Sequence, residues 1–130
     1  MISTWADLQS YARARYRLAR DDADSFALIF AITGERTQQV VVRHFRALDR
    51  DFIELRTPVC RETELDPRVA LRHNATCTVG ALALHEGMYF LIHRALLQTL
   101  DGEEFELPLQ AMALHADTLE ARHTGGLDAF

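Results

Sequence analysis

The fold is decided by the second half of the chain, which reads LDPRVALRHN (65–74), GALALHEGMYFLIH (80–93) and DGEEFELPLQAMALHADTLEARHTGGLDAF (101–130). Asp66 and Pro67 predict a helix start, because a carboxylate caps free amides and proline fits the first helical position. We expect this helix to run from Pro67 to His73 and to end at Asn74 in a left-handed conformation.

Two strands are predicted next, Thr76 to Leu84 and Met88 to Ala95, joined by a tight turn at residues 85–87. Both strands carry apolar residues on both faces. The isolated Gly80 cannot form a phosphate-binding loop, and we expect it to permit a close approach by a helix or a neighbouring chain.

A last helix is predicted from Asp101, with Glu104 placed for a capping box. Pro108 should kink this helix or mark the start of its longer part. We expect Gly125-Gly126 to end it and Phe130 to pack back onto the domain or onto a second subunit. The apolar stripe of the helix consists of Phe105, Leu109, Met112, Ala116 and Leu119.

The sequence pattern in the first half of the chain predicts one helix followed by a three-stranded antiparallel meander. Ser3 or Thr4 should cap a helix that runs to about Arg13. Pro58 has no amide to donate, so we expect the third strand to end there or to lie at a sheet edge. The predicted strands cover Phe26 to Ile32, Gln39 to Leu48 and Phe52 to Val59.

The predicted order is helix-strand-strand-strand-helix-strand-strand-helix, an α+β fold in a single domain over residues 1–130. Short turns imply an antiparallel five-stranded sheet with its helices packed mainly on one face. The apolar side chains of the other face would then need a partner. This arrangement favours a homodimer or the binding of another protein.

The composition and net charge of the chain disfavour several classes of function. The 130 residues are 48% hydrophobic, which suits one domain with a proper core. No stretch is long and apolar enough to span a membrane and no signal peptide is evident, so we expect a cytoplasmic protein without membrane contact. A net charge of −5 disfavours nucleic acid as a partner and favours a basic protein partner.

Few residues are arranged for chemistry, and we expect neither enzymatic activity nor a cofactor. Cys60 and Cys77 should be small apolar thiols, not metal ligands or a disulfide. No two of the six histidines are spaced i, i+4, so a bound metal is not expected. No serine or cysteine lies in a nucleophile motif.

The second half resembles the type III secretion chaperone-like superfamily, most closely its YbjN-like branch, which includes proteins described as bacterial sensory transduction regulators. The resemblance implies a small, cytoplasmic, non-enzymatic homodimer that binds another protein. It implies no catalytic residues. The residues that carry the resemblance are Leu65–Pro67, Leu71–Asn74, Gly80, Gly87–Phe90, Ala116–Glu120 and Thr124–Phe130.

Three functions follow as hypotheses. The leading one is a homodimer that presents part of its sheet and its first helix to a segment of a partner protein, in a chaperone-like or regulatory role. The second is a small-molecule or metal-binding sensor, with or without hydrolytic activity, that uses the strand histidines His44, His85 and His93. The third is a structural subunit that only dimerises. The partner or dimer surface predicted for the first comprises Val79, Ala81, Tyr89, Leu91, Trp5 and Phe130.

Overall fold

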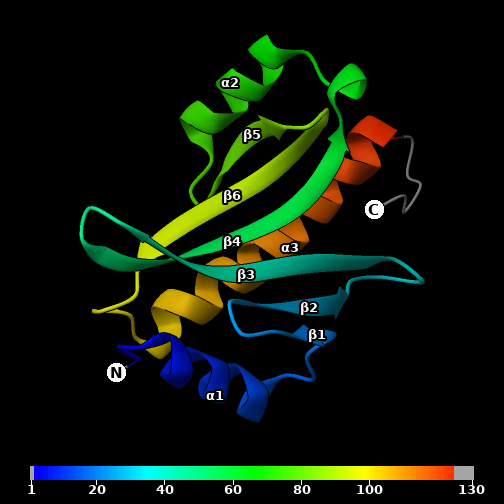
Figure 1. The fold of residues 1–130 in the computed structure, drawn as a ribbon. Coiled ribbons are helices and arrows are strands. Elements are labelled where there is room, and N and C mark those ends of the chain that lie inside the picture. The colour runs from blue at the N-terminus through cyan, green and yellow to red at the C-terminus, as the bar shows by residue number, and fades with distance from the viewer. Residues whose placement is uncertain (1, 125–130) are drawn as a thin grey trace.

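The computed structural model describes residues 2–124, and these form an antiparallel sheet with helices on one side (Figure 1). The helices are α1 (Trp5–Arg15), the short 3-10 helix η1 (Glu62–Glu64), α2 (Pro67–Thr76) and α3 (Gly102–Thr124). The strands are β1 (Arg20–Asp21), β2 (Ser25–Ala31), β3 (Thr37–Ala47), β4 (Arg50–Arg61), β5 (Ala81–His85) and β6 (Met88–Leu96).

The sheet has six strands in the order β1-β2-β3-β4-β6-β5, every neighbouring pair antiparallel. The predicted α+β class is therefore confirmed, but the strand number of five was wrong. The additional strand β1 pairs Arg20 with Ala27 and Asp21 with Phe26. Two residues are too few for an alternating pattern, so the sequence gives no sign of this strand.

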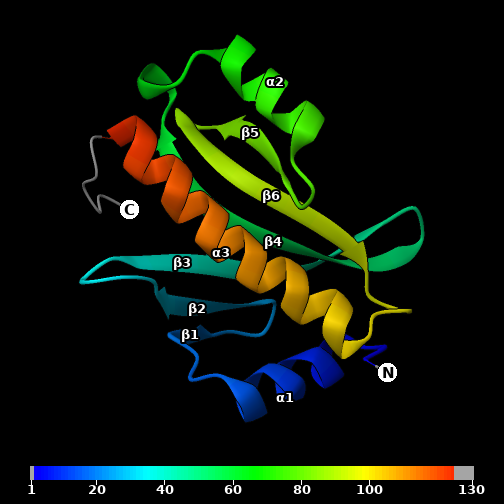
Figure 2. The same cartoon turned by 180° about the vertical axis from the view of Figure 1, so that it is seen from behind.

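Helix α3 crosses the sheet diagonally on one face (Figure 2). Its predicted capping box is confirmed, since the backbone amide of Glu104 donates to Asp101 and that of Asp101 donates to Glu104. The helix continues through Pro108 as a single element. Its predicted apolar stripe is buried in the core. Gly125, Gly126 and the tail to Phe130 lie outside the described residues, so the predictions made for them stay predictions.

Helix α1 lies on the same side of the sheet, beside α3. The Thr4 side chain accepts a hydrogen bond from the amide of Asp7 and so caps this helix, as predicted. Tyr11 and Tyr16 both donate hydrogen bonds to the carboxylate of Glu106 on α3, at 2.6 and 3.0 Å. These two bonds fix the position of α1 against α3.

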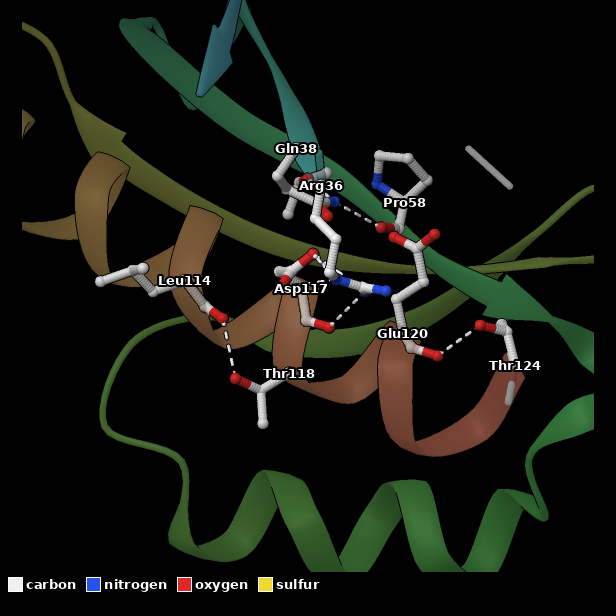
Figure 3. Close-up of polar contacts among 9 residues, drawn as sticks. Arg36, Gln38, Pro58, Leu114, Asp117, Thr118, Glu120 and Thr124 are labelled. Atoms are coloured by element: carbon white, nitrogen blue, oxygen red, sulfur yellow. Dashed lines mark hydrogen bonds and ion pairs between the residues drawn. The ribbon is translucent and has the colours of Figure 1, made fainter. Parts of the chain in front are cut away.

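Strand β4 is central, between β3 and β6, which contradicts the edge position predicted from Pro58. The register of β4 against β6 shifts between Pro58 and Cys60. A bulge at this point accommodates a residue that lacks an amide donor. The carbonyl of Pro58 accepts a hydrogen bond from the buried side chain of Gln38 on β3, at 2.8 Å (Figure 3).

The C-terminal half of α3 is fixed to the start of strand β3 by polar side chains. The guanidinium of Arg36, just before β3, lies 3.0 Å from the carboxylate of Asp117 and also donates to the Asp117 carbonyl (Figure 3). Glu120, one turn later, is fully buried. This cluster holds α3 in place where the apolar stripe ends.

Helix α2 ends later than predicted, at Thr76, so Asn74 lies inside it and is not a left-handed terminus. The Asn74 side chain donates to the carbonyl of Leu82 at 3.0 Å and accepts from the Leu82 amide at 2.7 Å. These two hydrogen bonds take the place of those that a neighbouring strand would form at the outer edge of β5. Strand β5 begins only at Ala81, because Gly80 has a φ of +79° and redirects the chain.

A close approach does occur at Gly80, but strand β6 of the same chain makes it, and not the helix or neighbouring chain that we expected. A Cβ atom at Gly80 would lie 3.1 Å from Cγ of Leu91. Within residues 2–124, none of the helices is long and apolar enough to cross a lipid bilayer.

Candidate functional site

The sheet face opposite the helices has no covering layer in the part of the chain that the structure describes (Figure 1). Side chains alternate between the two faces of a strand, and Ile53 and Leu55 of β4 point into the core. Glu54 therefore points to the opposite face, and Arg43 and Arg94 lie beside it on β3 and β6. We call this surface the open face, and its central residues are Arg43, Phe45, Phe52, Glu54, Arg56, Phe90, Ile92 and Arg94.

Three arginines surround one carboxylate at the centre of the open face. Glu54 is fully buried although no helix covers it. The distances from its carboxylate oxygens are 3.1 Å to Arg43 Nε, 3.0 Å to Arg56 Nε and 2.9 Å to Arg94 Nη2. Burial alone would raise the pKa of Glu54, but the hydrogen bonds from Arg43 and Arg94 and the charge of Arg56 outweigh it and lower the pKa.

Aromatic rings support the same arginines. Phe45 and Phe52 stack with their centroids 5.5 Å apart. The guanidinium of Arg43 lies 5.0 Å from the Phe45 centroid, and that of Arg56 lies 5.1 Å from the Phe90 centroid. All three rings are half-buried. The open face is therefore a rigid platform of rings and guanidinium groups that remain accessible to a ligand.

The charge of this platform is opposite to that of the whole chain. Three guanidinium groups surround a single carboxylate, whereas the chain has a net charge of −5. The partner expected from net charge alone was basic. The local charge of the open face instead favours an acidic ligand.

The predicted partner surface is not a single surface in the structure. Tyr89 and Leu91 are buried on the helix-bearing side, with exposures of 2% and 0%. Val79 is half-buried in the turn before β5, and Ala81 is exposed on β5. Strands that are apolar on both faces do not reveal which face the helices cover. Phe130 lies outside the described residues.

Trp5, the sixth predicted residue, is half-buried on α1 and packs against the core. Its ring stacks on Phe26 and on His44, with centroids 5.4 and 5.6 Å away, and its indole donates to the carbonyl of Ala23. These contacts give Trp5 a structural role in joining α1 to β2 and β3.

The three strand histidines do not form a group in residues 2–124. His44 Nε2 lies 2.8 Å from a carboxylate oxygen of Asp51, His85 is exposed at the β5–β6 turn, and His93 is half-buried on β6. Burial lowers the pKa of His93. The sensor hypothesis thus loses the convergence of strand histidines on which it depended.

A different set of metal-ligating side chains does meet. His73, Cys77 and His115 place their ligand atoms within 4.8 Å of one another. The sequence interpretation held that neither cysteine has a histidine at metal-ligand spacing, and for Cys77 this was wrong, since His73 lies four residues before it. Both cysteines are free thiols, and burial raises the pKa of Cys60 to about 11.

The geometry of residues 2–124 defines a class of fold: an antiparallel sheet with its helices on one face and an arginine-rich open face on the other. No family model matches the chain, and a comparison with curated proteins found no match.

Among solved structures, the chain is similar to a chain of the HopA1–SchA chaperone–effector complex. The TM-score is 0.64 at 13% sequence identity, over 87% of this chain and 89% of that chain. At this identity the similarity shows that the two chains share a fold.

Proposed function

We propose that this protein is a non-enzymatic binding protein whose open face holds an extended segment of a partner protein, in a chaperone-like role. The observation that carries the proposal is an uncovered sheet face on which half-exposed aromatic rings lie among three arginines. A folded sheet normally covers such a face with a helix or a second sheet. Here a partner segment provides the cover.

The proposed ligand is a segment that combines acidic and apolar side chains. Arg43 and Arg94 keep 44% and 55% of their side-chain surface exposed, so each retains donors for a second carboxylate. The rings of Phe45 and Phe90 offer apolar surface between them. A segment with acidic residues alternating with aliphatic or aromatic ones fits both features.

The fold comparison supports this proposal. The similar solved structure is a chaperone–effector complex, in which the fold occurs together with a protein ligand. A chaperone-like role is consistent with a platform that recognises an unfolded segment by charge and apolar contact, since neither requires a folded partner.

We extend the proposal to a homodimer formed through the outer surface of α3. Four exposed residues on this surface carry no charge, and Leu107 and Leu114 are 59% and 58% exposed. Two copies of an uncharged stripe meet without like-charge repulsion, as a twofold interface requires. The stripe consists of Leu107, Gln110, Leu114 and Thr118.

The finer assignment that we propose is to the YbjN-like branch, in the cytoplasm. Its support is that α2 begins directly after Asp66, that β5 and β6 form a hairpin around Gly87, and that α3 contains Ala116–Glu120, all of which belong to the residues that carry the resemblance. Two free cysteines fit a reducing compartment. An experimental YbjN-like structure should superpose on this chain with a TM-score above 0.64, and a lower score would contradict the assignment.

The binding proposal is tested with a displayed library of random peptides, each about twelve residues long, which spans a strand of the length found here. We expect the wild-type protein to enrich peptides with an excess of Asp and Glu among apolar residues. The variant Arg94→Gln should bind these peptides on the order of tenfold more weakly, because a charge-assisted hydrogen bond is lost.

The matched control is Arg72→Gln, which removes the same charge from an exposed position on α2. It should bind the selected peptides as the wild type does. Enrichment of basic peptides, equal weakening by both variants, or no enrichment at all would overturn the proposal.

A further inference from the structure

We infer that His73, Cys77 and His115 form a binding site for a transition-metal ion of the Zn²⁺ class, which joins α2 to α3. His73 lies in the last turns of α2, and Cys77 is the residue that caps this helix. Their spacing of four residues places both side chains on one side of the helix end. His115 approaches them from the middle of α3.

The imidazole rings of His73 and His115 face each other through their Nε2 atoms. Their Nε2 atoms are 2.6 Å apart, and the rings are nearly parallel, with centroids 4.8 Å apart. A contact of this length allows only one proton between the two nitrogens. In addition, His73 Nδ1 is buried and has no hydrogen-bond partner among residues 2–124.

The electrostatic surroundings favour neutral imidazole, the form that binds metal. Burial, the neighbouring His73 and Arg122 together lower the pKa of His115. A neutral His115 has a lone pair available at neutral pH. Cys77 is half-buried, and its thiol donates to the carbonyl of Val79 at 3.1 Å. Binding of the ion to the sulfur would release the thiol proton to solvent.

The ligand atoms lie close enough together for one ion to bind them all after a small rearrangement. Tetrahedral coordination with Zn–N bonds of about 2.0 Å requires the two nitrogens to stand roughly 3.3 Å apart and both lone pairs to point at the ion. The rings, which face each other nearly head-on, therefore need to separate by less than about 1 Å and to tilt. Two histidines and one cysteine supply three ligands. A cavity of about 350 Å³ adjoins them and leaves room for water as a fourth ligand, and it is lined by His73, Thr76, Cys77, Thr78, Val79, Ala111 and His115.

The site also has a structural consequence for α2. Ala70 is the only residue of this helix that is buried in the core. The hydrogen bonds of Asn74 attach the helix to β5, but the contact between His73 and His115 is its polar link to α3. A metal ion at this position would therefore fix α2 on the sheet much more firmly.

The test is titration of the chelator-treated, reduced full-length protein with Zn²⁺ alone, by calorimetry. We expect one ion per chain and a rise in Tm of several degrees at about 100 times the Kd. With Co²⁺ we expect visible d–d bands of tetrahedral coordination and a thiolate charge-transfer band in the near ultraviolet.

The variants His115→Gln and Cys77→Ser should each weaken Zn²⁺ binding on the order of 10- to 100-fold, at least the loss known for groups that merely support a ligand. His85→Gln, an exposed histidine outside the cluster, is the control and should bind as the wild type does. Unchanged binding in both cluster variants would overturn the inference. Should the variants fail to fold, a wild-type Co²⁺ complex without the thiolate band would overturn it equally.

Discussion

The carboxylate of Glu54 on β4 lies 2.9 Å from the guanidinium of Arg94 on β6, fully buried on a sheet face that no helix covers. Arg43 and Arg56 complete its surroundings. The carboxylate is shielded from water by the arginines themselves and by the rings on which they lie. This relationship organises the open face, and a change at Glu54 should affect both stability and binding.

Glu54→Gln should destabilise the protein by about 2 kcal/mol at pH 7. Removal of a buried ion-pair partner costs more than this, but the surrounding arginines are partly exposed to water, which reduces the loss. Urea unfolding monitored by circular dichroism measures the difference. A variant as stable as the wild type at pH 7 would show that the three ion pairs contribute nothing.

The pH dependence of the same variant has a definite sign. Although burial opposes it, the arginines lower the pKa of Glu54 in the folded protein below its ordinary value of 4.5. The stabilisation is therefore complete above about pH 4.5 and is lost as the pH falls through the folded-state pKa. The difference in unfolding free energy between wild type and Glu54→Gln should shrink as the pH falls below about 4.5. A constant difference would contradict this origin.

Gly80→Ala should destabilise the protein more than Gly87→Ala. Both glycines have positive φ, +79° and +81°, so an alanine at either costs about 1 kcal/mol of backbone strain. Only at Gly80 would the new Cβ press against Leu91, at 3.1 Å, and overpacking adds on the order of 1 kcal/mol or more. Thermal unfolding of the two variants measures their losses of stability relative to the wild type. Equal losses of stability would argue against a close approach of β6 to Gly80.

Asp101→Ala should lower the unfolding free energy by about 1 kcal/mol, because the Asp101 side chain accepts from the Glu104 amide at the start of α3. Glu103→Ala removes a charge from the same turn and leaves both hydrogen bonds of the capping box intact, and should cost roughly 0.3 to 0.5 kcal/mol. The urea midpoints of unfolding of the two variants distinguish the contribution of the cap from that of the helix charge. Equal effects would mean that helix charge, and not the cap, stabilises this end.

The double variant Leu107→Glu, Leu114→Glu should elute as a monomer when the wild type elutes as a dimer in size-exclusion chromatography with light scattering. Negative charges placed on both sides of a twofold interface repel each other. Leu71→Glu, at a 68% exposed position on α2, should remain a dimer. A monomeric wild type, or a double variant that stays dimeric, would contradict the interface proposed on α3.

The helical half of the fold was predictable because its signals are local. The Asp101–Glu104 cap and the apolar stripe from Phe105 to Leu119 are contained within one element, and both are confirmed. Strand β1 is too short to have a pattern, and the central position of β4 depends on pairing with β6, far along the chain. Such long-range pairing is set by packing and not by local preference.

The candidate surface could be predicted only in part. Alternation placed Glu54 and Arg56 away from the core, but it does not show that Arg94, forty residues later, pairs with Glu54. The doubly apolar strands concealed the burial of Tyr89 and Leu91, since both of their faces resemble a core face. The approach of His115 to His73 likewise depends on how α3 crosses the sheet, which no local pattern specifies.

The central claim is that the open face binds an extended acidic and apolar segment. The most direct test is a nuclear magnetic resonance titration of ¹⁵N-labelled protein with a peptide selected from the displayed library. The account predicts that the largest chemical-shift changes fall on Arg43, Phe45, Glu54, Phe90 and Arg94. Changes concentrated on α1 or α3, with the open face unaffected, would contradict it.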